Sequence, residues 1–163
     1  MNIGEWTTRL AFRRPDAPCI KYNELELNQR QFNRRINRLA NALLEKGLQK
    51  GQRVAVLLGN SNVFLEMLFA LSKIGGIMVP LNFRLAPPEL VYILNDAEPE
   101  MLIYSPEFLP VMQAMEGQVP SVKTLVCEMD GGNPDDLAYE AWIADYSVEE
   151  PTIDYDVDFE DPH

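Results

Sequence analysis

Few side chains in this sequence are of the kinds that carry out catalysis, and their spacing does not match the usual constellations. The single histidine, His163, is the last residue, so we do not expect it at the buried centre of a catalytic triad. Cys19 and Cys127 lie far apart and outside any C-x-x-C arrangement, and a zinc site would lack ligands. The sequence therefore predicts two buried free thiols in a reducing cytoplasm, and no catalytic, cofactor-binding or metal-binding residue.

A run of acids near the end of the chain is the next group that might hold an ion. Its members are Asp154, Asp156, Asp158, Glu160 and Asp161. Carboxylates suit hard cations, but the run lacks the glycine turn of a calcium loop. We expect these side chains to be solvated charges in an exposed connection that covers residues 149–163.

Phosphate binding would need glycines that let backbone amides approach an anion at the start of a helix. The chain has nine glycines, and none lies in a G-x-G-x-x-G or G-x-x-x-x-G-K-[ST] pattern. Gly75 and Gly76 follow a predicted helix and precede a predicted strand, which is the wrong order for such a turn. We interpret this pair as a helix stop.

The clearest helix is predicted over residues 29–46. Asn28 and Gln31 are spaced for a capping box, and Gly47 suits a left-handed end. Apolar residues follow the helical period on one side, and arginines cover the other. These arginines are Arg30, Arg34, Arg35 and Arg38. We expect them to be solvated or paired with acids, with anion binding as the less favoured alternative.

The remaining elements predict the fold class. A short helix over residues 3–12 precedes a hairpin of strands at 18–22 and 25–27. From residue 53 strands alternate with helices, and we predict strands at 53–58, 77–81, 101–104 and 122–127 and helices at 62–74, 87–96 and 107–116. This order predicts an α/β fold with a partial doubly wound, mostly parallel sheet.

Charge divides the chain into two parts. Residues 1–127 carry 14 Lys and Arg against 12 acids, a net charge of +2, whereas residues 128–163 carry 13 acids and no Lys or Arg. An acidic segment repels nucleic acid and anionic lipid, so we expect neither as a partner. The most apolar stretch, residues 54–81, is too interrupted to span a bilayer. Residues 135–146 are predicted to form an acidic helix.

The order of segments resembles a known family. Residues 27–43, residues 47–56 and the motif Leu71-Ser-Lys-Ile-Gly-Gly-Ile-Met-Val-Pro-Leu-Asn82 resemble the opening of the adenylate-forming (AMP-binding) superfamily. The segment that follows, Asn82-Phe-Arg-Leu-Ala-Pro-Pro-Glu-Leu90, resembles the corresponding segment of acyl-CoA ligases. Asn28-Gln29 stands where the family usually has Thr-Tyr, and Asn can cap a helix equally well.

The resemblance implies a parent enzyme that activates a carboxylic acid with ATP to acyl-AMP and then transfers it to CoA. It implies ATP, Mg²⁺ and CoA for that parent. The family's phosphate loop, Asp for the ribose and catalytic Lys match no segment of this chain. We therefore predict that residues 1–127 form an N-terminal α/β subdomain and residues 128–163 a connection, and that this piece alone is inactive.

The resemblance leaves the substrate class, the function of the piece on its own and its partners with alternatives. Fatty acid is the preferred substrate class, on the style of residues 80–84, and aryl acid is the alternative. A stand-alone, non-catalytic interaction module is a further alternative. The expected partners are the rest of the AMP-binding domain and a mobile C-terminal domain, with a homodimer as a further possibility.

Overall fold

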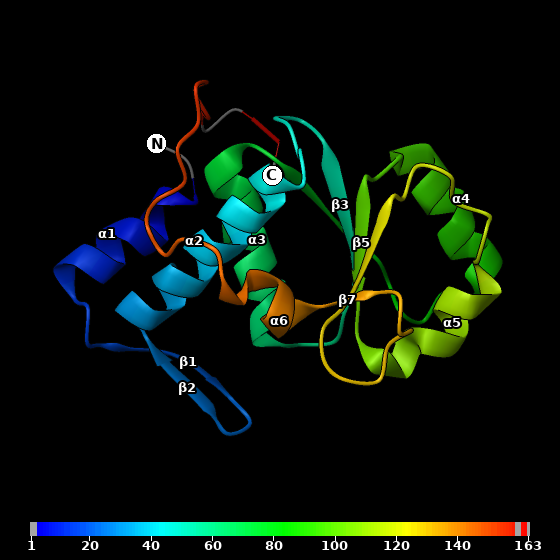
Figure 1. Ribbon diagram of the computed structural model, residues 1–163, viewed down its shortest axis with the longest axis horizontal. Coiled ribbons are helices and arrows are strands. Elements are labelled where there is room, and N and C mark those ends of the chain that lie inside the picture. The colour runs from blue at the N-terminus through cyan, green and yellow to red at the C-terminus, as the bar shows by residue number, and fades with distance from the viewer. Residues whose placement is uncertain (1–2, 159–160, 163) are drawn as a thin grey trace. The chain divides into compact units, whose positions relative to one another are not determined.

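The computed structural model describes residues 3–158 and 161–162, which group into two compact units (Figure 1). Unit 1 draws on Met1–Gly51, Ser61–Ile77 and Ile143–His163, and unit 2 on Gln52–Asn60 and Met78–Trp142. Each unit joins segments that are distant in sequence. The predicted division at residue 127 concerns the parent enzyme and stays a prediction.

Unit 1 consists of helices and a hairpin. Its elements are α1 (Glu5–Arg13), β1 (Pro18–Tyr22), β2 (Leu25–Asn28), α2 (Gln29–Glu45) and α3 (Asn62–Ile74). The strands β1 and β2 pair antiparallel around Asn23, whose φ is +51°. This confirms the predicted hairpin.

The capping box of α2 forms as its spacing predicts. The Gln31 amide donates to Asn28 Oδ1 at 2.8 Å, and the Asn28 amide donates to Gln31 Oε1 at 2.9 Å. Two helix amides that would otherwise lack acceptors are satisfied in this way. The helix ends before Gly47, which takes the left-handed φ of +85°.

The apolar sides of α2 and α3 form the core of unit 1. The rings of Phe32 and Phe69 meet edge to face, with centroids 6.0 Å apart. Ile36 and Leu43 on α2 and Met67 on α3 are fully buried. Gly75 ends α3 with a φ of +68°, as expected for a helix stop.

Unit 2 contains a five-stranded sheet in the order β4-β3-β5-β6-β7. Its elements are β3 (Arg53–Leu57), β4 (Ile77–Pro80), α4 (Pro87–Ala97), β5 (Met101–Tyr104), a 3₁₀ turn at Pro106–Phe108, α5 (Leu109–Ala114), β6 (Thr124–Cys127), β7 (Leu137–Ala138) and α6 (Tyr139–Ala144). The first residue of β4 and the last two of α6 fall within the bounds of unit 1. The pairs β3–β5, β5–β6 and β6–β7 are parallel. The α/β class and the parallel sheet are therefore confirmed.

One face of this sheet packs against α4 and α5. Alternate residues along the strands point to the same face, so Leu57, Leu102 and Tyr104 share a cluster with Leu94 of α4 and Met112 of α5. Strands of a parallel sheet are covered on both faces, which explains why their sequences are almost entirely apolar.

The segment after Cys127 corrects one prediction. Residues 135–146 do not form a single helix. Leu137 and Ala138 instead add a short strand beside Val126 and Cys127, and only Tyr139–Ala144 is helical. A two-residue strand carries no periodic pattern, so its pairing depends on the neighbouring strand. In the same way, the helix predicted at 107–116 divides into a 3₁₀ turn and the shorter α5.

The final segment corrects a second prediction. Residues 147–158, called the strap from here on, run beside α1 and α2 of unit 1 (Figure 1) rather than forming a merely exposed connection. Tyr155 donates its hydroxyl to the Ile74 carbonyl at 2.9 Å. Along the strap exposure alternates, with Ile153 and Tyr155 half-buried and Asp154 and Asp156 exposed.

The close packing around Gly132 predicts that a side chain at this position lowers stability. A Cβ placed there would lie 2.6 Å from Cys127 Cβ and 2.8 Å from Tyr104 Oη, so Gly132→Ala must displace the turn. We expect it to lower the free energy of unfolding by about 2 kcal/mol, measured by urea titration. The matched control is Gly59→Ala in the same unit, where the nearest atom lies at 3.9 Å. An equal loss in both variants would contradict the close contact.

Candidate functional site

The carboxyl edge of the sheet in unit 2 is the first place to look for a site, because ligands of open α/β sheets bind there. After β5, Ser105 donates its hydroxyl to Glu128 Oε2 at 2.6 Å, and Glu128 follows β6. Both side chains are buried. After β4, the Arg84 amide donates to Asn82 Oδ1 at 3.0 Å. These polar groups are engaged with one another, which stabilises the edge.

Tyr104 organises the turn beyond β6. Its hydroxyl donates to Asp136 Oδ2 and accepts the Asn133 amide at 3.2 Å. Burial raises the pKa of Tyr104, and the Asp136 carboxylate raises it further. The phenol therefore stays protonated and acts as a hydrogen-bond donor that fixes this turn, not as a base.

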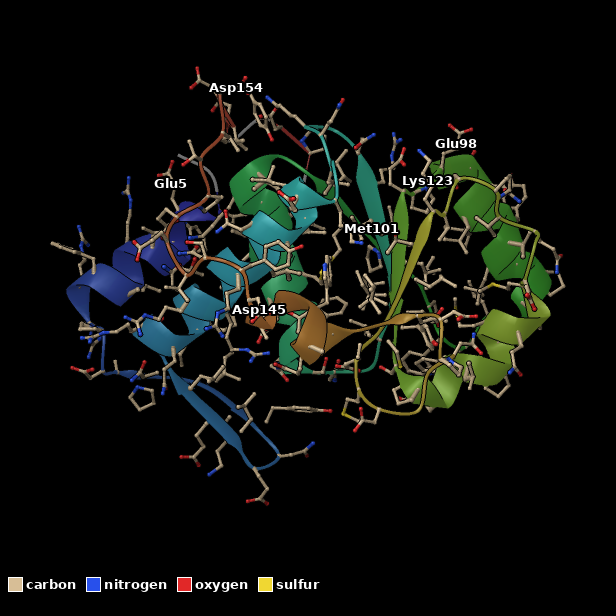
Figure 2. All side chains as sticks on the ribbon, in the orientation of Figure 1. Glu5, Glu98, Met101, Lys123, Asp145 and Asp154 are labelled. Atoms are coloured by element: carbon tan, nitrogen blue, oxygen red, sulfur yellow. The ribbon has the colours of Figure 1, made fainter. Side chains whose placement is uncertain are left out.

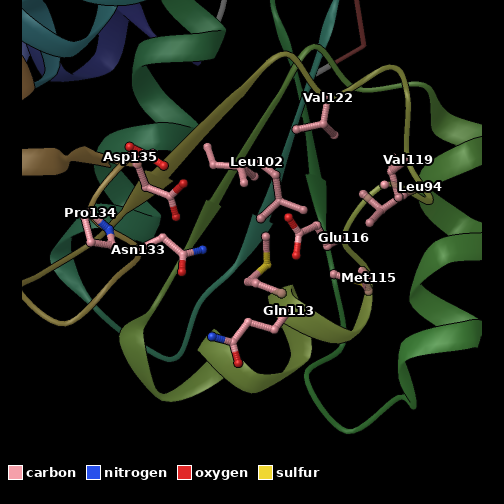
Figure 3. A pocket seen from close by; sticks show the side chains of 14 residues that line it. Leu94, Leu102, Gln113, Met115, Glu116, Val119, Val122, Asn133, Pro134 and Asp135 are labelled. Atoms are coloured by element: carbon pink, nitrogen blue, oxygen red, sulfur yellow. The ribbon is translucent and has the colours of Figure 1, made fainter.

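A cavity of about 400 Å³ lies beside this turn in unit 2 (Figure 3). Its lining combines apolar side chains, among them Leu94, Leu102 and Met115, with the carboxylates of Glu116, Asp135 and Asp136. The lining residues include no Lys, Arg or His. Carboxylates can act as acids or bases, but Asp136 already accepts a hydrogen bond from the Tyr104 hydroxyl.

The other concentration of polar side chains is in unit 1, around the ammonium group of Lys73. Its four oxygen partners lie between 2.6 and 2.9 Å from Nζ. They are Thr8 Oγ1 from α1, Asn33 Oδ1 and Asn37 Oδ1 from α2, and Glu150 Oε2 from the strap. The Lys73 side chain is only 4% exposed. We call this group the Lys73 cluster.

Burial and charge act in opposite directions in the Lys73 cluster. Burial lowers the pKa of Lys73, and the hydrogen bond that Lys73 donates to Glu150 only partly offsets this effect. For Glu150, burial acts to raise the pKa, but the hydrogen bonds from Lys73 and Asn33 outweigh it and the net pKa is lowered. The ionised pair is therefore the form that the surrounding amides favour.

A second buried ion pair joins α2 to α3. Arg35 Nε donates to Glu66 Oε1 at 2.7 Å, and Asn62 Nδ2 donates to the same oxygen at 2.8 Å. Glu66 is fully buried, whereas the Arg35 side chain is 18% exposed. Arg30 lies 3.6 Å from Asp16. Two of the four arginines on this side of α2, Arg30 and Arg35, thus pair with acids, which was one of the two arrangements expected for them.

The structure places the cysteines and most of the terminal acids that the sequence analysis considered. Both cysteines are free, Cys127 buried and Cys19 half-buried. Of the terminal acids, Asp161 pairs with Lys50 at 2.8 Å, and Glu160 lies outside the described residues. No group of three or more His, Cys, Asp or Glu within 3–158 and 161–162 is arranged to hold a metal ion. Within the same ranges, no helix is long and apolar enough to cross a membrane.

The ionic partners of Lys73, Glu66 and Glu150 were not predicted from the sequence; Lys73 and Glu66 are buried, and the Glu150 side chain is 46% exposed. Lys73 and Glu66 stand in a helix that is otherwise almost wholly apolar, and that contrast was the available signal. Charged residues are almost never buried without partners. A predicted buried helix with two charges therefore calls for acceptors and donors elsewhere in the chain.

The Glu150 pair makes a pH prediction. Its folded pKa is lowered, so the stabilisation is complete above the unfolded pKa of about 4.3 and is lost as pH falls through the folded value. Wild type should exceed Glu150→Gln in free energy of unfolding at pH 7, and the difference should shrink below pH 4. Urea titrations at several pH values measure this. A difference that grows on acidification would refute the assignment.

The buried Arg35–Glu66 pair makes a prediction about stability. Arg35→Met leaves a buried carboxylate without its guanidinium partner, which costs about 3 kcal/mol. Removing both charges in Arg35→Met with Glu66→Met should restore most of that loss, because apolar packing replaces the pair. Lys123→Met, which breaks the exposed Lys123–Glu100 pair, is the control and should cost less than 1 kcal/mol. A double variant as unstable as Arg35→Met would contradict this account.

Comparison with known proteins identifies the family. The sequence pattern of the family described as AMP-binding enzyme matches residues 8–156. A feruloyl-CoA synthase from Amycolatopsis sp is 39% identical over 114 residues, which is 70% of this chain and 23% of that protein. The fatty acid–[acyl-carrier-protein] ligase ScoC from Streptomyces coeruleorubidus is 32% identical over 150 residues, covering 92% of this chain and 27% of the relative.

Solved structures agree with the sequence relatives. The crystal structure of the anthranilate CoA ligase AuaEII in complex with anthranoyl-AMP matches with a TM-score of 0.90 at 28% identity, over 99% of this chain and 31% of that one. This chain spans about a quarter of the length of the curated relatives named above. With a match over residues 8–156, the chain belongs to the AMP-binding enzyme family.

Proposed function

We propose that this chain is the N-terminal part of an acid–CoA ligase. The parent would join a carboxylic acid to ATP, releasing pyrophosphate and forming acyl-AMP, and CoA would then displace AMP. The observation that carries the proposal is the family match over residues 8–156, together with relatives that are themselves named as ligases or synthases of organic acids. The ordered motif at residues 71–82 supports it.

The role of this chain within the ligase is that of a scaffold. The polar groups described above already have partners inside the chain: Lys73 has four oxygens, Glu66 has Arg35 and Asn62, and Ser105 has Glu128. Among residues 3–158 and 161–162, no three His, Cys, Asp or Glu side chains lie close enough together to hold a metal ion. We therefore assign the contacts to ATP, Mg²⁺ and CoA to the remainder of the parent enzyme.

Fatty acid is the proposed substrate class, and aryl acid is a second candidate. The style of residues 80–84 and the relative ScoC, which is named as a fatty acid ligase, support the first. The names of the feruloyl-CoA synthase and the anthranilate CoA ligase favour the second. A cytoplasmic location and a homodimer stay predictions.

The test is an activity assay on the gene product that carries this chain at its full natural length. Pyrophosphate release should require ATP, Mg²⁺ and an organic acid, and thioester formation should require CoA. A panel of hexanoate, palmitate, ferulate and anthranilate at equal concentration ranks the two substrate classes by kcat/KM. We expect a fatty acid to give the highest kcat/KM. A higher kcat/KM for ferulate or anthranilate would favour an aryl acid as the substrate class.

The control is the 163-residue chain by itself. Calorimetry with MgATP should show no specific binding, because its polar groups are engaged internally. Stoichiometric binding, or turnover of ATP with any acid by this chain, would overturn the scaffold role. A full-length product that stays inactive with every acid would instead favour the interaction module, and light scattering would then report its self-association.

A further inference from the structure

The strap contacts the helices of unit 1 in two ways. In the first, side chains of α2 donate hydrogen bonds to backbone carbonyls of the strap. Asn37 Nδ2 donates to the Val148 carbonyl at 2.8 Å, and Asn41 Nδ2 donates to the carbonyls of Ser147 and Glu149 at 3.0 and 3.1 Å. Every residue has a carbonyl, so these bonds guide the path of the strap without selecting its register.

Register matters because the strap alternates. Ile153, Tyr155 and Val157 are half-buried, and the acids between them are exposed, with Asp154 pointing outward (Figure 2). In an extended segment successive side chains point to opposite sides, so a slip of one residue would turn the acids toward the helices. Contacts of particular strap side chains must therefore fix the alignment, and the Tyr155 hydroxyl bond to the Ile74 carbonyl is one of them.

The second kind of contact has that specificity. Glu150 accepts from Lys73 Nζ at 2.6 Å, from Asn33 Nδ2 at 2.9 Å and from Thr8 Oγ1 at 3.0 Å. Asn37 Nδ2 also donates to Glu150 Oε1, at 3.2 Å. Burying an ammonium group is costly, and a methionine would fill the same volume without that cost. Lys73 is buried, whereas the Glu150 side chain is 46% exposed. Buried charged groups are best attested as devices that fix register, and the buried Lys73 ammonium group fits that use.

Lys73 has no hydrogen left for a reactant. An ammonium group has three N–H donors, and four oxygens surround it within 2.9 Å. The side chain is also almost completely buried. Lys73 thus acts on other residues of the protein and not on a substrate.

We propose that Lys73 and Glu150 are positioning residues of the ligase, which set the register of the strap along the helices of unit 1 and, through it, the path of the chain toward the remainder of the parent enzyme. This inference rests on the proposed function. Misplacing reacting groups by about 1 Å can cost about 10²-fold in rate, so a slipped strap should lower kcat.

The first test measures the strap directly. Chymotrypsin cleavage after Tyr155 requires the strap to leave unit 1, because the Tyr155 hydroxyl is bonded to Ile74. In the 163-residue chain, Glu150→Gln and the double variant Lys73→Met with Glu150→Met should both be cleaved about tenfold faster than wild type. Lys123→Met, which breaks an exposed ion pair of equal length in unit 2, should be cleaved like wild type. Unchanged cleavage in both Glu150 variants overturns the pair as the element that holds the strap.

The second test separates positioning from stability in the full-length gene product. The double methionine variant keeps an apolar filling, so its midpoint of urea unfolding should match that of wild type, whereas kcat should fall about tenfold with the KM of the acid within twofold. Wild-type kcat in this variant overturns the positioning role. A wild-type protein without turnover overturns the ligase assignment instead, and the positioning role with it, while cleavage after Tyr155 still decides whether the pair holds the strap.

Discussion

A charge that leaves water must be surrounded by partners, and in unit 1 this requirement brings three segments of the chain to the ammonium group of Lys73. Thr8, Asn33, Asn37 and Glu150 come from α1, α2 and the strap, which are far apart in sequence. The geometry is specific because each oxygen has to lie within hydrogen-bond distance of Lys73 Nζ. A purely apolar contact among the same segments would allow many alignments, whereas this one allows few.

The fold was predictable from the sequence wherever local signals and burial agree. The capping box at Asn28, the helix stop at Gly75 and the apolar strand at residues 53–57 all mark their own boundaries. The strand at Leu137–Ala138 does not, because two residues carry no period and depend entirely on pairing with β6. The strap was missed for a related reason: its alternating acids are typical of solvated segments, and its attachment depends on side chains more than a hundred positions away.

For the candidate site, the sequence predicts no catalytic, cofactor-binding or metal-binding residue, and that stays a prediction. In the structure Lys73, Glu66, Ser105 and Tyr104 form hydrogen bonds with other residues of the chain. Satisfied buried networks of this kind specify a unique arrangement. Their partners come from distant segments, so the spacing of residues along the sequence could not reveal them.

The contrast between the two thiols has a practical consequence for spectroscopy. Burial raises the pKa of both thiols, so access to the sulfur is what distinguishes them. Cys127 is buried in the sheet of unit 2 with Gly132 against it, whereas Cys19 lies on the hairpin strand β1 and is only half-buried. A maleimide fluorophore or spin label should therefore attach at the hairpin alone, giving a single-site reporter on unit 1 without any cysteine having to be engineered in or out.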